Sequence, residues 1–143
     1  MTQRTRDEFP AAIAANEAAV PRGREATVPA AWRVGTRRKV KRLRSQACFQ
    51  AAGEYVVHHR DLAPTLVHGT YVMDPWPIPT PHAWVEIEST TVYDGVTGRF
   101  YDRTSYYETV HAVAEVRYTV REAAERITAT KHWGPWVMSQ DAV

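Results

Sequence analysis

The sequence predicts an α+β fold in which a helix packs on a small, mostly antiparallel sheet and a second helix follows. Two observations support this prediction. Apolar residues recur every three or four positions before His59, which is typical of an amphipathic helix. From Leu66 onward they alternate every second position in several short runs, which is typical of consecutive strands without crossover helices between them.

The chain of 143 residues is long enough for one compact domain. Residues 1–31 contain three prolines and few large apolar side chains, so we expect them to form a flexible N-terminal arm. Residues 32–143 are then expected to form the single domain.

The first helix is expected to end at His59 and to begin at about Ser45 or earlier. If Ser45 is the N-cap, Cys48 lies in the first turn. A start nearer Arg37 would place Cys48 in the middle of the helix, and the apolar spacing agrees with both starts.

Three strands are expected after this helix. The first covers residues 66–73, and two more cover residues 82–88 and 90–94, with a turn near Ser89. The proline-rich run at 74–81 is expected to be a rigid surface loop, because proline has no N–H group to donate to a sheet.

The last third of the chain is expected to begin with an aromatic-rich loop over residues 100–107, followed by a strand over 111–118. Thr119 and Glu122 have the spacing of a capping box, so a helix is expected to start there and to end near Thr130. The two tryptophans of the tail that follows are expected to pack on the domain.

Cys48, His82 and Asp94 are the candidate catalytic residues. On adjacent antiparallel strands, His82 and Asp94 can face each other, and the helix can bring Cys48 to the same place. The nucleophile of a thiol enzyme is the thiolate, so an imidazole must take the proton and a carboxylate must fix the imidazole tautomer. Backbone N–H groups near Cys48, with the side-chain amide of Gln46 or Gln50, are candidates for binding the oxyanion.

The surrounding residues resemble a known superfamily. Residues 81–87, Pro-His-Ala-Trp-Val-Glu-Ile, and residues 92–97, Val-Tyr-Asp-Gly-Val-Thr, resemble the histidine and aspartate strands of transglutaminase-like and papain-like cysteine enzymes. Residues 45–49, Ser-Gln-Ala-Cys-Phe, resemble the start of their cysteine-bearing helix. The sequence departs from the family at position 95, where glycine stands in place of the frequent proline, and at Phe49, where tryptophan is frequent.

This resemblance implies a transglutaminase-like or papain-like core and a covalent acyl-enzyme on Cys48. It implies a hydrolase or acyltransferase, such as a peptidase, an amidase or a transglutaminase-like enzyme. The substrate would be a protein, a peptide or a small acyl compound, and no cofactor is implied. A small domain of this kind would be similar to compact hydrolases or acyltransferases of bacteria and bacteriophages.

Each candidate residue also has an ordinary structural explanation. A single cysteine on a helix is often a small buried apolar residue. His82 could pack on the proline-rich run, and Asp94 could form the turn before Gly95. The order of all three residues together is what favours catalysis.

The charge distribution favours a second hypothesis. Residues 1–60 carry a net charge of +7, and residues 61–143 carry −5. The basic segment 33–44 contains no acidic residue: it begins with Arg33 and includes the polyanion-binding candidates Arg37, Arg38, Lys39, Lys41, Arg42 and Arg44. They would form either a solvated helix face or a surface that contacts nucleic acid or an acidic protein, and in the latter case the chain would be a non-catalytic binding module.

Composition restricts the function classes further. One cysteine excludes an internal disulfide and a zinc site built from several thiolates, and the histidines show no familiar metal-binding spacing. No apolar window is long enough to span a membrane, so we expect a cytoplasmic protein without a membrane partner. Among the aromatic residues, Trp76, Trp84 and Tyr101 are candidates for lining a cleft.

Overall fold

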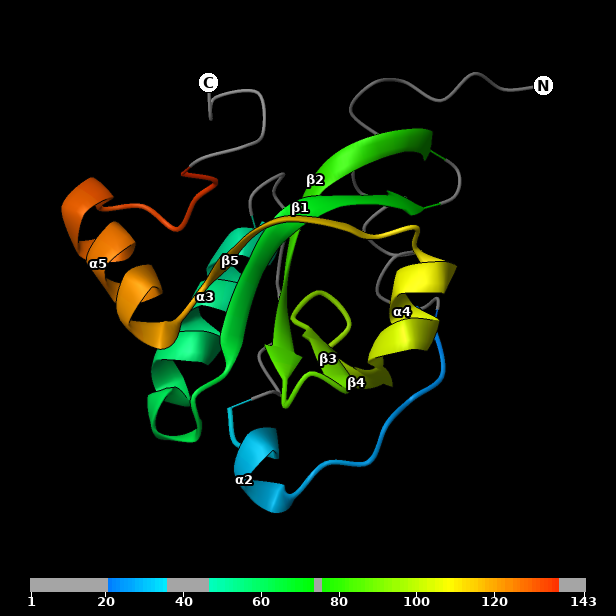
Figure 1. Ribbon diagram of the computed structural model, residues 1–143, viewed down its shortest axis with the longest axis horizontal. Helices are drawn as coiled ribbons and strands as arrows, with labels where there is room; N and C mark the ends of the chain where they lie inside the picture. The colour runs from blue at the N-terminus through cyan, green and yellow to red at the C-terminus, as the bar shows by residue number, and fades with distance from the viewer. Residues whose placement is uncertain (1–20, 36–46, 74–75, 137–143) are drawn as a thin grey trace, which may run out of the picture.

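The computed structural model describes residues 21–35, 47–73 and 76–136, without side chains at 73–76. These residues form an α+β fold around an antiparallel five-stranded sheet with the order β4-β3-β2-β1-β5, which confirms the predicted fold class (Figure 1). In chain order the elements are α2 (Ala30–Arg33), α3 (Ala47–His58), the 3-10 helix η1 (Arg60–Leu62), β1 (Thr65–Met73), β2 (Trp76–Ile87), β3 (Thr91–Asp94), β4 (Arg99–Asp102), α4 (Arg103–Thr109), β5 (Val113–Tyr118) and α5 (Val120–Thr130).

The proline-rich run that we expected to be a loop forms the first part of β2. This strand begins at Trp76, opposite Met73 of β1, and Pro81 lies opposite Thr70. The prolines occupy alternate positions, so their missing N–H groups face one side of the strand, the side away from β1. Because β3 pairs only with the last three residues of β2, that side has no strand partner here among the described residues. An unpaired edge tolerates proline, which is why the loop prediction was wrong.

The two strands predicted on either side of Ser89 are confirmed. Ser89 and the residue before it adopt the left-handed backbone conformation, with φ of 57° and 52°, and form a tight turn between β2 and β3. The turn sets a register in which Val85 lies opposite Tyr93. Since side chains alternate along a strand, His82 and Asp94 then lie on the same face of the sheet.

The aromatic-rich segment is not a loop but the strand β4 and the helix α4. Phe100 and Tyr101 point to opposite faces of the sheet and join different core clusters. The helix α4 starts after Asp102, whose carboxylate accepts a hydrogen bond from the backbone N–H of Ser105 at 2.9 Å. This N-cap is a local signal for a helix that apolar spacing alone does not predict.

The final strand and helix are confirmed as β5 and α5. The Thr119 hydroxyl accepts from the backbone N–H of Glu122 at 3.1 Å, and the Glu122 carboxylate accepts from the backbone N–H of Thr119 at 3.0 Å. These two hydrogen bonds form the predicted capping box. Trp133 and Trp136 of the tail pack, partly buried, against the core, as predicted.

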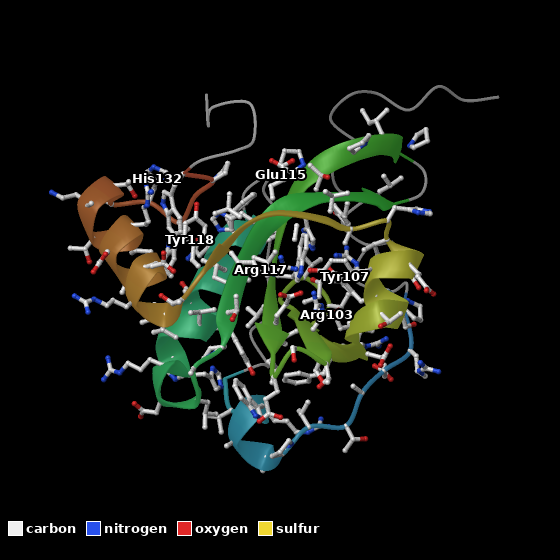
Figure 2. All side chains as sticks on the ribbon, in the orientation of Figure 1. Arg103, Tyr107, Glu115, Arg117, Tyr118 and His132 are labelled. Atoms are coloured by element: carbon white, nitrogen blue, oxygen red, sulfur yellow. The ribbon has the colours of Figure 1, made fainter. Side chains whose placement is uncertain are left out.

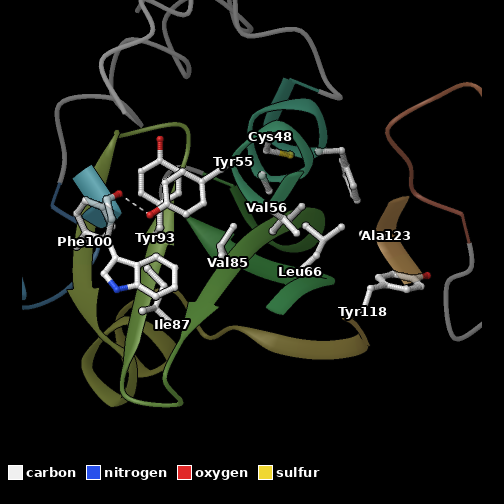
Figure 3. Packing of buried hydrophobic residues seen from close by; sticks show 14 of the residues in the cluster. Cys48, Tyr55, Val56, Leu66, Val85, Ile87, Tyr93, Phe100, Tyr118 and Ala123 are labelled. Atoms are coloured by element: carbon white, nitrogen blue, oxygen red, sulfur yellow. Dashed lines mark hydrogen bonds between the residues drawn. The ribbon is translucent and has the colours of Figure 1, made fainter. Parts of the chain in front are cut away.

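Helices α3 and α5 cover one face of the sheet, and α4 lies on the other face (Figure 1). Each face therefore has its own cluster of buried side chains. The α3 cluster, part of which is drawn in Figure 3, includes Phe49, Tyr55, Val56, Leu66, Val85 and Tyr93. The α4 cluster comprises Val67, Tyr71, Trp84, Val92, Tyr101, Tyr106 and Val110. Within the described residues, every helix is too short or too polar to cross a membrane.

Residues 21–35, named here the N-terminal segment, run beside β4 and α4 to α2 (Figure 1). The backbone N–H of Asp102 donates to the carbonyl of Arg24 at 2.8 Å, and the backbone N–H of Ala26 donates to the carbonyl of Phe100 at 2.9 Å. These bonds attach the segment to the edge of the sheet.

Side chains of the same segment are also buried. Val28 and Trp32 join the α3 cluster, and Arg22 is fully buried. The described part of the predicted arm therefore packs against the domain. Backbone pairing with a sheet edge needs no apolar residues, so composition alone did not predict it. Residues 1–20 lie outside the described part.

Candidate functional site

The structure brings Cys48, His82 and Asp94 into contact. Cys48 is the second residue of α3 as described, His82 lies in β2, and Asp94 ends β3. The Nε2 atom of His82 lies 3.2 Å from Oδ2 of Asp94, and the Cys48 side chain is close enough to the same imidazole to raise its pKa. His82 and Asp94 are 1% and 0% exposed, whereas Cys48 keeps 8%. The cysteine is therefore the member of the group closest to solvent.

A close contact between α3 and the turn after β3 holds the cysteine near the carboxylate. Gly95 follows Asp94 directly, and a Cβ atom at position 95 would lie only 2.5 Å from the Cβ of Ala51. Ala51 is one helical turn after Cys48, on the same side of α3. Glycine at position 95 thus permits the helix to approach the end of β3, a role that its reading as a turn residue did not predict.

Asp94 is a fully buried carboxylate with several hydrogen-bond donors. Its Oδ2 atom lies 2.6 Å from Nη1 of Arg22 and accepts from the Tyr106 hydroxyl at 2.8 Å, while Oδ1 accepts from the backbone N–H of Val96 at 2.8 Å. Burial raises the pKa of this carboxyl, but the charges of Arg22 and His82 and the hydrogen bonds outweigh it and hold the pKa far below its usual range. Asp94 is therefore ionised at neutral pH.

The imidazole of His82 is enclosed by aromatic rings and polar groups. The ring of Tyr71 stacks on it at a centroid distance of 4.0 Å, and Trp84 stacks at 5.8 Å. Burial by itself would lower the pKa of His82, but the charge of Asp94 and the contact with Cys48 outweigh it and raise the pKa to about 9. At neutral pH the imidazole is then protonated.

The hydrogen-bond network also defines the tautomer of a neutral His82. Tyr106 donates its hydroxyl proton to Asp94, so its oxygen can accept from Nε2, which lies 3.1 Å away. Asp94 is likewise an acceptor. Nε2 therefore carries a proton, and Nδ1 is the ring nitrogen without one when His82 is neutral.

Three residues of this site were missed by sequence reasoning. Tyr71 and Tyr106 belong to strand and aromatic runs that indicate only packing. Arg22 stands between a proline and a glycine in the segment expected to be an arm, and no local pattern marks it. It reaches the site because the N-terminal segment pairs with β4, which is a tertiary contact.

Of the other predicted site residues that the structure describes, Trp84 contacts His82, whereas Gln50 and Tyr101 contact none of the three candidate catalytic residues. Gln50 is exposed and donates to the Glu54 carboxylate at 2.9 Å, away from the site. Trp84 and Tyr101 are fully buried in the α4 cluster, so the prediction that they line a cleft was wrong. Alternation along β2 and β4 turns both rings inward against α4. The remaining candidates lie outside the described residues: Gln46, the side chain of Trp76, and the basic group Arg37, Arg38, Lys39, Lys41, Arg42 and Arg44.

A second polar cluster lies on the same face of the sheet, around Glu86. Its carboxylate accepts from the Arg117 Nε at 2.7 Å and from the Tyr107 hydroxyl at 2.6 Å, and it pairs with Arg103 at 2.9 Å (Figure 2). Burial raises the pKa of Glu86, and these donors outweigh it and lower the pKa. Because Trp84 donates its indole N–H to Tyr107 at 3.1 Å, the cluster holds the ring that packs beside the candidate site.

A cavity of about 590 Å³ lies along α3, and Cys48, His82 and Asp94 are not among the described residues that line it. Its lining includes Ala51 and Gly95, the contact pair described above, and the rings of Tyr55 and Tyr93, which stack with centroids 4.1 Å apart. The volume is within the range of pockets that bind small molecules, roughly 300–1,000 Å³. Polar residues that also line it are Arg33, Glu54, His58 and His59.

Among the described residues, no group of three histidine, cysteine or acidic side chains is arranged to hold a metal ion. Comparisons with protein-family models, with curated proteins and with solved structures found no match to this chain.

Proposed function

We propose that this protein is a cysteine-dependent hydrolase or acyltransferase with a transglutaminase-like, papain-like core. Cys48 is the nucleophile, His82 the general acid and base, and Asp94 the carboxylate that orients His82. The observation that carries the proposal is that one buried imidazole interacts with both a thiol and an ionised carboxylate, which come from three separate elements.

The proposed reaction proceeds through an acyl-enzyme. The thiolate of Cys48 attacks the carbonyl carbon of an amide, ester or thioester while His82 holds the thiol proton. When the tetrahedral intermediate collapses, the bond to the leaving group breaks and His82 gives it that proton. Water or an amine then attacks the thioester, His82 takes the attacking group's proton, and Cys48 leaves as thiolate.

The negative charge on the carbonyl oxygen needs hydrogen-bond donors. Backbone N–H groups near Cys48 in α3 are the candidates. These N–H groups are the donors that we assign to the oxyanion. The cavity along α3 would receive the acyl part of the substrate, since stacked tyrosine rings line it.

The pH dependence of alkylation by iodoacetamide tests the ion pair. Cys48 is the single cysteine of the chain, so the alkylation rate reports on this thiol alone. We expect the midpoint of the profile to lie well below 8 in the wild type, compared with about 8.5 for a free thiol. In His82→Ala the midpoint should move toward the free-thiol value, whereas His111→Ala, which changes an exposed histidine outside the site and the cavity, should leave it unchanged.

A second measurement tests acyl transfer itself. With p-nitrophenyl acetate we expect a burst of nitrophenolate that approaches one per Cys48 and an acetyl group on Cys48 in the intact mass. Cys48→Ser should lose both. Faster turnover when an amine is added would favour a transferase, and an unchanged turnover would favour a hydrolase. A slow thiol that is indifferent to His82 contradicts the proposed function.

A further inference from the structure

Arg22 is a buried charge in the site to which the proposed reaction gives no role. Its side chain is 0% exposed, and Nη1 lies 2.6 Å from Oδ2 of Asp94 and 3.4 Å from Nε2 of His82. The guanidinium also lies over the ring of Tyr71, 5.2 Å from its centroid. An arginine remains charged when buried, and removing it from water is costly unless an anion is beside it. Asp94 is that anion.

The backbone around Arg22 is held at a defined place. The N–H of Arg24 donates to the Ser105 hydroxyl at 2.7 Å. Gly23 has a φ of 135°, which side chains rarely permit, and a Cβ atom there would lie 3.0 Å from Ser105 and from the backbone of Tyr106. The N-terminal segment therefore touches α4 beside the tyrosine that also donates to Asp94.

Charge balance suggests what Arg22 does. The charges of Arg22 and Asp94 cancel, so protonation of His82 gives this buried group a net positive charge. Ionisation of Cys48 balances that charge. Without Arg22, the carboxylate of Asp94 would itself be the counter-ion of protonated His82, and the thiol could keep its proton.

We propose that Arg22 is a positioning residue of the candidate site: it holds Asp94 toward His82 and, by cancelling the carboxylate charge, makes protonation of His82 favour ionisation of Cys48. This inference rests on the proposed function. It also gives the N-terminal segment a function, because that segment supplies one of the four charged groups of the site.

The alkylation profile of Arg22→Met tests this inference. At pH 6.5 we expect at least a tenfold lower rate than in the wild type, and a midpoint that is at least one pH unit higher. Arg24→Gln is the matched control, because Arg24 belongs to the same segment but its side chain is 76% exposed. This control should keep the wild-type profile.

Further variants separate a role in charge from a role in folding. Arg22→Lys keeps the charge and should give an intermediate midpoint. Arg22→Ala should recover part of its rate at pH 6.5 when millimolar guanidinium is added, but not with equal sodium chloride. The double variant Arg22→Met/Asp94→Asn removes both members of the ion pair, which proteins tolerate better than removal of one. If Arg22 acts through Asp94, Cys48 in this variant should be alkylated at the same rate as in Asp94→Asn alone.

Two results would overturn the inference: a folded Arg22→Met protein with the wild-type profile, or a loss that is equal at every pH and is relieved neither by lysine nor by guanidinium. Failure of the proposed function looks different. In that case the wild-type thiol is already slow, and His82→Ala does not change it.

Discussion

Two buried histidines on neighbouring strands of the same sheet have opposite environments. His82 in β2 contacts Asp94 and Cys48, and its pKa is raised to about 9. His68 in β1 is also 0% exposed, but neither of its ring nitrogens has a hydrogen-bond partner among the described residues. Burial alone acts on His68 and lowers its pKa to about 4.

The surroundings of His68 are aromatic. Phe49 and Tyr118 contact it edge-on at centroid distances of 4.7 and 5.2 Å, and Trp136 lies at 4.9 Å. Burial is the same physical cause at both histidines, and it disfavours the charged imidazole at both. The comparison shows that a nearby ionised group, not the degree of burial, decides which of the two is charged at neutral pH.

The largest effect should come from Asp94→Asn, which removes the group that distinguishes the two histidines. Arg22 and protonated His82 would then be buried without their counter-charge, so we expect a loss of about 3–5 kcal/mol in the free energy of unfolding. The pKa of His82 should fall below the ordinary value of about 6.5, as that of His68 does. Urea unfolding at pH 7 and an NMR titration of the imidazoles measure the two effects.

Asp102→Asn is the control for that prediction. Asp102 caps α4, and asparagine caps a helix as well as aspartate does, so the expected change is within about 1 kcal/mol. An Asp94→Asn protein in which the pKa of His82 stays near 9 would contradict the assigned cause of the shift.

His68→Leu should remove a pH dependence of stability. The folded-state pKa of about 4 lies below the unfolded value of about 6.5, so between these values the unfolded chain binds a proton that the folded protein does not. The free energy of unfolding therefore has its full value above pH 6.5. As the pH falls toward 4, proton uptake by His68 in the unfolded chain lowers it by about 3 kcal/mol in total. The leucine variant does not lose this free energy. Its free energy of unfolding relative to that of the wild type should therefore rise by about this amount between pH 7 and pH 4.

Unfolding curves at several pH values measure this gain. His58→Leu is the control for the substitution itself, because that side chain is exposed. A pH-independent difference for His68→Leu would show that His68 is already protonated, or solvated, in the folded protein.

The smallest effect should come from Trp136→Ala, which opens the aromatic surroundings of His68 to water. Since this indole is only partly buried, we expect a cost of about 1–2 kcal/mol. The pKa of His68 should rise from about 4 toward its ordinary value. Trp133→Ala is the matched control: its ring packs on Gly53 of α3, so the pKa of His68 should not change. A rise in both variants would mean loosening of the whole tail instead.

Much of the fold could be predicted from local patterns. The period of the apolar residues indicated α3 and the strands on either side of Ser89, and the Thr119–Glu122 pair indicated the start of α5. The errors concern β4, α4 and the proline-rich part of β2. The last of these depends on which edge of a strand is paired, and a single strand does not contain that information.

By itself, the sequence determined the order of the elements and the approach of His82 to Asp94, because two strands joined by a short turn pair in a register that the turn sets. The tertiary structure alone decided three things: that α3 contacts the turn after Asp94 through Gly95, that Arg22 enters the site, and that His82 differs from His68 in charge. Each depends on groups distant in sequence meeting where water is excluded. There the free energy of a charge depends on its neighbours in space, which local residue patterns do not specify.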